Sequence, residues 1–323
     1  MATFYTLQAS NRRKSALLLL VVAVVFAVFG AAAGFALNGT VEAALGALVI
    51  ALVVSVVLSL GSYYGGDALV LATSGAKEAD SARDAELLNV VRELSLASGI
   101  PMPRVYLIDD SAPNAFATGR DPKHASIAVT AGLLNKLDRE ELQGVIGHEL
   151  AHVGNFDIRF ALLVGVLVGS IALLADFFLH SMRWGGMGHR SRRDEGGGGA
   201  QVIVMVLGLI LAVLAPMFAR LVQMAVSRQR EYLADATSVA LTRNPVGLER
   251  ALAKIAGDSE VLEVANRATQ HLYIVNPIKK FEDRARGLFS THPPIGDRIN
   301  RLRALRGASP LGAGSLSETE AAE

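Results

Sequence analysis

The chain has 323 residues, no cysteine and a formal net charge of +1, and 51% of its residues are hydrophobic. The absence of cysteine excludes disulfides and cysteine-ligated zinc, so a metal site would need His, Asp or Glu ligands. The near-neutral charge gives no indication of a nucleic-acid partner.

Two long apolar runs open the chain, Ala16–Leu37 and Val41–Leu60. Each has the roughly 20 residues that a membrane-spanning helix needs. Arginine and lysine precede the first run, and the loop between the runs has neither. The positive-inside rule therefore predicts a cytoplasmic N-terminus at 1–15 and a transmembrane hairpin at 16–60. A cleaved signal peptide is disfavoured, because the first run exceeds the roughly 7–15 residues of a signal core.

A segment of mixed structure follows. Helical periodicity over 83–98 ends at Gly99, and strand patterns cover 105–108, 115–118 and 126–130. The middle strand and the residue before it are candidates to pair with an extended substrate by strand addition, although an ordinary sheet strand explains the pattern equally well. These candidate substrate-binding residues are Asn114, Ala115, Phe116, Ala117 and Thr118.

The next predicted helix carries an H-E-x-x-H motif at 148–152, after a capping-box signal at Asp138 and Glu141. His148 and His152, four residues apart, share one helical face and would bind one Zn²⁺, with Glu149 handling the proton. The motif also arises by chance on surface helices. Here, however, Glu149 falls within an apolar stripe, and small residues occupy the opposite face. A buried glutamate is costly unless it is paired or functional, which favours the zinc site.

Two further apolar runs, at 160–179 and 202–219, predict a second membrane hairpin over 160–219. A buried pair of core helices is the alternative. If helix continues from His152, the metal lies roughly 12 Å from the start of the third run. The linker 181–199 is glycine-rich and predicted to be flexible. Its arginines conflict with the positive-inside rule if both runs span, so re-entrant segments stay open.

A catalytic zinc usually has three protein ligands, and the motif provides two. Glu231 is the candidate third ligand. Asp235 lies one turn further on the same helical face and would hydrogen-bond the far nitrogen of a ligand histidine. An ordinary exposed acidic pair fits this spacing equally well.

Several separated motifs in the same order resemble the HtpX family of membrane zinc metalloproteases, to which the CAAX prenyl proteases are more distantly related. The resemblance extends from the first apolar hairpin to about Leu305 and implies that Glu231 is the third zinc ligand. It is carried by His148–His152 with Asn155 and Asp157, Glu231 with Asp235, 290–294 with Arg298, and 114–120.

The expected fold is an α+β membrane protein. Its mainly helical, zincin-type metalloprotease domain would contain a small β-sheet, and about four helices would span or insert into the membrane. The protease domain would comprise 61–159 and 220–306, with the second hairpin between these parts. Residues 307–323 would form a flexible tail.

The expected activity is zinc-dependent hydrolysis of peptide bonds, with Glu149 as general base and then acid. His292 is a candidate donor to the oxyanion, or a structural loop residue. Arg298 would serve the same role or anchor its loop, and Asn155 and Asp235 would support the ligands from outside the metal's coordination sphere.

The resemblance implies a single Zn²⁺ cofactor and an enzyme of the bacterial inner membrane whose active site faces the cytoplasm. Its substrates would be misfolded or damaged membrane proteins, and the lipid bilayer would be its other partner. Two alternatives stay open: a processing protease for one membrane substrate, and a non-catalytic scaffold. In the scaffold, His292 would be the fourth ligand of a structural zinc.

Overall fold

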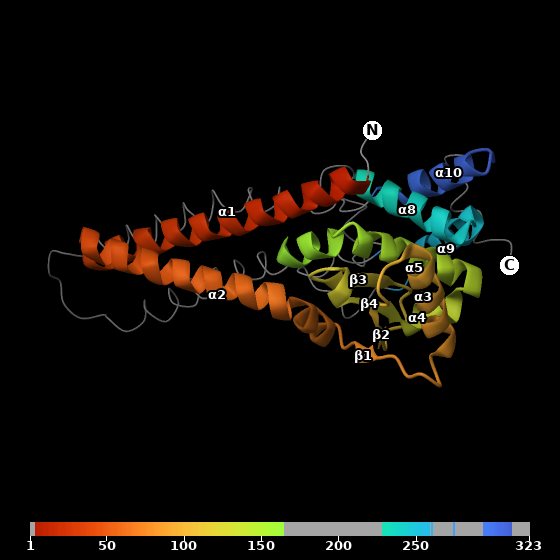
Figure 1. Cartoon of the computed structure of the whole chain (residues 1–323), viewed down its shortest axis with the longest axis horizontal. Helices are drawn as coiled ribbons and strands as arrows, with labels where there is room; N and C mark the ends of the chain where they lie inside the picture. Colours follow the sequence, from red (N-terminus) through yellow and green to blue (C-terminus); the bar gives the residue numbers. More distant parts are fainter. Residues whose placement is uncertain (1–3, 165–227, 259, 261–273, 275–292, 312–323) are drawn as a thin grey trace.

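The computed structural model describes residues 4–164, 228–258, 260, 274 and 293–311. Helices α1 (Phe4–Asn38) and α2 (Val41–Thr73) form a hairpin that projects from a mainly helical domain (Figure 1). The two helices approach closely because glycines of α1 face α2. A Cβ atom built on Gly34 would lie 2.5 Å from the carbonyl oxygen of Ala43. Small residues at a helix contact are the usual basis of close packing in a membrane.

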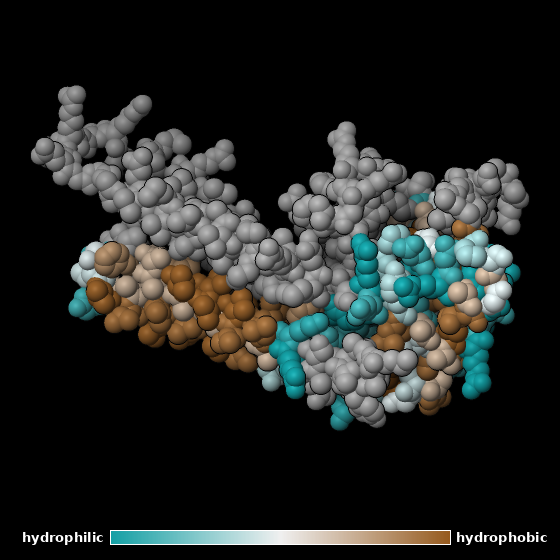
Figure 2. All heavy atoms as spheres, turned by 90° about the horizontal axis from the view of Figure 1, so that it is seen from above, coloured by the Kyte–Doolittle hydropathy of each residue, from teal (hydrophilic) through white to brown (hydrophobic). Residues whose placement is uncertain are grey.

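Apolar side chains cover the exposed surface of the hairpin (Figure 2). Two stretches, Arg13–Phe35 and Val41–Thr73, are long and apolar enough to cross a membrane. The second helix thus continues past Leu60, where we expected the hairpin to end. Of the predicted second hairpin, residues 165–219 lie outside the described residues, and so does the linker 181–199. In the described part of the chain, two of the four expected membrane helices are therefore found.

A four-stranded mixed sheet has the order β1-β2-β4-β3, with β2 and β4 parallel and the outer pairs antiparallel. The three predicted strands are confirmed within one residue at each end. The fourth, β1, was missed because two residues carry no alternating pattern. The strands are β1 (Lys77–Glu78), β2 (Arg104–Ile108), β3 (Ala115–Gly119) and β4 (Ala125–Thr130).

Helix α5 (Arg139–Gly154) lies at the centre of the domain, between the sheet and the helices α8 to α10 (Figure 1). Both hydrogen bonds of its predicted capping box are present: the Asp138 side chain accepts from the N–H of Glu141, and the Glu141 side chain accepts from the N–H of Asp138. The predicted apolar stripe is buried in the main core. The other helices are α3 (Ala85–Ser98), α4 (Ala131–Lys136), α8 (Arg228–Thr242), α9 (Pro245–Gly257) and α10 (Ile295–Leu305), and a 3-10 turn covers Pro122–His124.

Helix α5 does not continue into the third apolar run, so the distance based on a continuous helix is wrong. The helix ends at Gly154, Asn155 caps it, and Phe156 has a φ of 59°. Residues 157–164 then form a new helix. Its buried side chains Phe160, Leu163 and Val164 pack against the first membrane helix.

The face of α5 that carries small residues is confirmed as a packing surface. A Cβ atom on Gly144 would lie 2.7 Å from the backbone of Leu248 in α9, and one on Gly147 would lie 2.8 Å from Oγ of Ser238 in α8. Ser238 also donates a 2.6 Å hydrogen bond to the carbonyl of Gly144. These contacts hold α8 and α9 close to the motif helix.

Replacing Gly144 by alanine should therefore destabilise the domain by about 1–3 kcal/mol, because the new methyl group meets backbone that cannot turn aside. The measurement is the midpoint of thermal unfolding in detergent. Gly257→Ala is the matched control, since a Cβ atom there meets nothing within 4 Å. Equal midpoints for the two variants would contradict the close packing of α5 and α9.

Candidate metal centre

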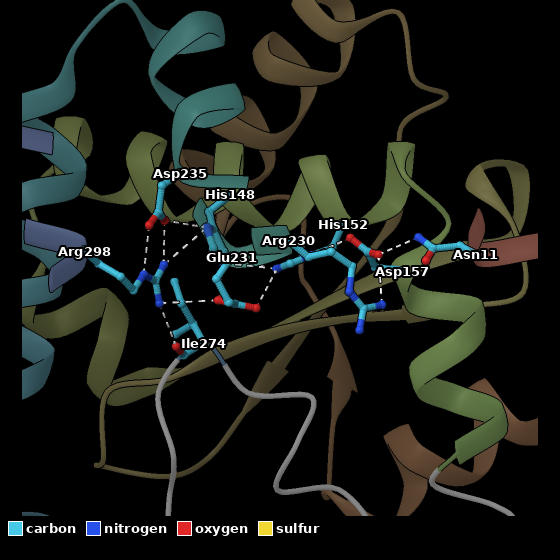
Figure 3. Close-up of polar contacts among 9 residues, drawn as sticks. All are labelled: Asn11, His148, His152, Asp157, Arg230, Glu231, Asp235, Ile274 and Arg298. Carbon is cyan, nitrogen blue, oxygen red and sulfur yellow. Dashed lines mark hydrogen bonds and ion pairs between the residues drawn. The ribbon is translucent and has the colours of Figure 1, made fainter. Parts of the chain in front are cut away.

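Three side chains from two helices converge on one point (Figure 3). His148 and His152 come from α5, and their Nε2 atoms lie 3.1 Å apart. The carboxylate of Glu231, in the first turn of α8, lies 3.5 Å from Nε2 of His148 and 3.6 Å from Nε2 of His152. Glu231 is the candidate third ligand from the sequence, and α8 brings it to the motif.

Carboxylates hold the far nitrogen of each histidine. Asp235 Oδ1 lies 2.9 Å from Nδ1 of His148, and Asp157 Oδ2 lies 3.1 Å from Nδ1 of His152. A carboxylate beside Nδ1 keeps the proton there and leaves the lone pair on Nε2. Two lone pairs and a carboxylate facing one another are the donor set that Zn²⁺ binds, so these residues fit the metal.

Arg298 of α10 is fully buried and orients Asp235. Its guanidinium donates two hydrogen bonds to that carboxylate, at 2.6 and 2.9 Å, and one to the carbonyl of Ile274 at 3.2 Å. Burial opposes ionisation of Asp235, but Arg298 and His148 outweigh it and lower the pKa of Asp235. Arg298 thus holds the carboxylate of Asp235, which in turn contacts Nδ1 of His148.

The metal-free site favours a proton on His148. Burial and the charge of Arg298 oppose that proton, but hydrogen bonds to Asp235 and Glu231 outweigh both and raise the pKa of His148 to about 9. A metal ion would displace this proton, because Nε2 must be unprotonated to act as a ligand.

Glu149 points its carboxylate at the edge of the sheet. It is 2% exposed, and burial raises the pKa of Glu149 above its usual value. The charges of His148 and His152 act in the opposite direction, as does a hydrogen bond from the main chain of Ala117. A carboxylate with a raised pKa beside a metal site suits proton transfer.

The predicted substrate-binding strand lies next to this carboxylate. Within the described sheet, β3 has only β4 as a neighbour and forms an edge. Near its start, the N–H of Ile274 donates a 3.0 Å hydrogen bond to the carbonyl of Ala115. Asn114 precedes the strand, and its carbonyl accepts a hydrogen bond from Thr130. The side chains of β3 are buried.

His292 lies outside the described residues. Asn155 caps α5, and its buried Oδ1 has no hydrogen-bond partner among the described residues, while its backbone carbonyl accepts a 3.0 Å hydrogen bond from Asn11. Asp157 holds His152 instead. In the sequence, Asp157 was part of the motif that carries the family resemblance but had no predicted role, and Asn11 and Arg230 were not predicted to lie near the site. Asp157 could have been found as the nearest carboxylate after the motif.

Comparisons with known proteins found similar sequences over most of the chain. A model of peptidase family M48 matches residues 81–306. A Protease HtpX homolog of Thermoanaerobacter pseudethanolicus is 45% identical over 303 residues, which cover 94% of this chain and 98% of that protein. One of Caldanaerobacter subterraneus is 43% identical with the same coverage. The crystal structure of S. mikatae Ste24p aligns with a TM-score of 0.46 and 19% identity, over 92% of this chain and 66% of that one.

Proposed function

Since this chain belongs to peptidase family M48 and is a membrane-bound metalloprotease, we propose that His148, His152 and Glu231 hold its catalytic Zn²⁺ and that Glu149 is the general base. The observation that carries this proposal is the convergence of the three donors around one point, with Asp235 and Asp157 behind the two histidines. Glu149 follows His148 in the chain but is not one of the three converging donors. Three protein ligands leave the fourth position of a zinc ion free for water, as in catalytic sites.

Bound Zn²⁺ would acidify a water molecule and polarise the scissile carbonyl. The protein's own part is the movement of the proton. Glu149 takes the proton from the attacking water and passes it to the leaving nitrogen. Its raised pKa helps in this role, because a carboxylate with a higher pKa accepts a proton more readily. Asp235 and Arg298 would orient His148, and Arg298 also lies 3.5 Å from the carboxylate of Glu231.

We propose that the substrate lies as an extended strand along β3, over Ala115, Phe116, Ala117 and Thr118, with Asn114 at one end. The hydrogen bond from the main chain of Ala117 to Glu149 supports this, because it places the strand beside the proposed general base. Main-chain pairing is insensitive to side-chain identity and suits a protease that accepts many sequences.

We further propose that the substrates are misfolded or damaged membrane proteins. In this proposal the enzyme resides in the bacterial inner membrane with its metal site in the cytoplasm. The basic residues Arg12, Arg13 and Lys14 at the start of the first span support this orientation. His292 stays a candidate donor to the oxyanion. We propose that the first part of the protease domain begins after α2, rather than at residue 61, and runs to 159, and that the second part is 220–306. The predicted tail at 307–323 lies, from residue 312 on, outside the described residues.

The test is cleavage of an unfolded protein by the full-length enzyme in detergent. Removal of metal with a chelator should abolish cleavage, and addition of Zn²⁺ after the chelator is washed out should restore it. Cleavage that persists in demonstrably metal-free enzyme would overturn the zinc mechanism.

Asp235→Asn should weaken Zn²⁺ binding by roughly 10- to 100-fold, the usual effect of removing such a partner of a ligand histidine. It should also flatten the pH dependence of binding. In the wild type, Zn²⁺ competes with a proton up to the His148 pKa of about 9, so affinity rises with pH below that value. Loss of the Asp235 charge lowers the pKa of His148, so the rise of Zn²⁺ affinity with pH ends at a lower pH in the variant. Competition with a chromophoric chelator between pH 7 and 9 measures both effects, and identical slopes would contradict this role.

A further inference from the structure

The two ligand histidines are held by different parts of the molecule (Figure 3). His148 is fully buried and depends on Asp235 and Arg298, which belong to α8 and α10. The side chain of His152 is 17% exposed and depends on Asp157, which lies where the chain enters the helix at 157–164. Among the described residues, only the arrangement around His152 is hydrogen-bonded to the membrane hairpin.

Asn11 of α1 makes that contact. It is 2% exposed and lies just before the first candidate span, which begins at Arg13. Its side-chain amide donates a 2.7 Å hydrogen bond to Oδ1 of Asp157 and a 3.0 Å hydrogen bond to the carbonyl of Asn155. Both amide protons are thereby used on the segment that follows the motif helix.

These two hydrogen bonds bracket a strained residue. Phe156 has a φ of 59°, a left-handed conformation that non-glycine residues rarely adopt. Asn11 binds the residue before Phe156 and the residue after it. α1 thus fixes the turn that directs Asp157 toward His152. Further along, Leu18 and Val22 of α1 share an apolar cluster with Phe160, which joins α1 to the helix at 157–164.

The Asp157 carboxylate is shared in a way that makes its position depend on Asn11. Oδ1 accepts from Asn11 and, at 3.2 Å, from Arg230, while Oδ2 faces Nδ1 of His152. Loss of the Asn11 hydrogen bonds would free the carboxylate to rotate toward Arg230 and would release the strained turn. Nδ1 of His152 would then lose its fixed partner.

We infer that Asn11 is a positioning residue that couples the first membrane helix to the metal site, by holding Asp157 against His152. The inference rests on the metal site proposed above. It implies that the seating of α1 in the bilayer sets the geometry of one zinc ligand, so that the membrane anchor also controls the active site.

The test uses the full-length protein in detergent, loaded with Zn²⁺ for affinity and with Co²⁺ for its visible spectrum. Asn11→Ala should weaken metal binding by about tenfold, the low end of the range for direct partners of a ligand histidine, and should shift the Co²⁺ bands. Asn11→Asp keeps the side-chain shape but faces Asp157 with a second carboxylate, so its effect should be larger. A role in packing alone would leave this variant like the wild type.

Asn38→Ala is the matched control, because Asn38 lies at the other end of α1 and its amide, in the part of the chain that the structure describes, donates within its own helix to the carbonyl of Gly34. It should leave affinity and spectrum unchanged. In an Asp157→Ala background, Asn11→Ala should cause little further loss, because the residue through which it acts is gone.

Two results would overturn the inference: wild-type affinity and spectrum in Asn11→Ala, or an equal loss in both backgrounds. Failure of the wild type to bind either metal would instead overturn the proposed metal site itself. These outcomes separate the inference from the function on which it rests.

Discussion

Glu149→Gln should lower the rate of peptide cleavage by roughly 10²- to 10⁴-fold, the contribution expected of a positioned general base. Glutamine keeps the shape of the side chain and its contact with the sheet edge, but it cannot take a proton from water. Zn²⁺ content should stay at the wild-type level, because the three converging donors are His148, His152 and Glu231. Cleavage of an unfolded substrate and metal analysis of the same preparation measure the two effects.

Glu140→Gln is the matched control for this variant. It makes the same substitution on the same helix, but Glu140 is exposed and contacts Asn244 rather than the metal site. It should cleave at the wild-type rate. Full activity in Glu149→Gln would show that another group moves the proton. The inactive, metal-loaded variant would also capture substrates, and capture of one protein alone would favour a dedicated processing protease.

Glu231→Ala should release the metal. This change removes one of three ligands, so the loss of Zn²⁺ affinity should exceed the roughly 10- to 100-fold that follows removal of an outer partner. Cleavage should be lost with the metal, and an excess of Zn²⁺ should restore little of it. Metal content after purification and competition with a chelator are the measurements.

Glu231→Gln keeps the side-chain volume and should lose the metal as well, which separates ligation from packing. Glu249→Ala is the control for loss of a buried carboxylate. Glu249 is 8% exposed and pairs with Arg303 and Arg306, so its removal should leave metal content unchanged. Wild-type metal content in both Glu231 variants would mean that the third ligand lies elsewhere.

Local features of the sequence predicted much of this fold. The capping box at Asp138, the glycine end of α3 and the alternation in β2, β3 and β4 all occur where expected, because caps and periodicity are encoded by neighbouring residues. The burial of Glu149 followed from the apolar face around it. The break after Gly154 was missed, since Phe156 adopts a conformation that its residue type rarely takes.

The sequence alone determined the H-E-x-x-H pair and the apolar hairpin, since each is contained in one continuous segment. The spacing of Glu231 and Asp235 fitted an ordinary exposed acidic pair as well as it fitted a metal ligand and its partner. The packing of α8 on α5 placed the carboxylate of Glu231 beside both histidines. Tertiary structure alone also put Asp157 rather than the Asn155 side chain behind His152, and brought Asn11 to Asp157 across 146 positions of the chain. Contacts between distant segments depend on how helices pack, which local periodicity does not encode.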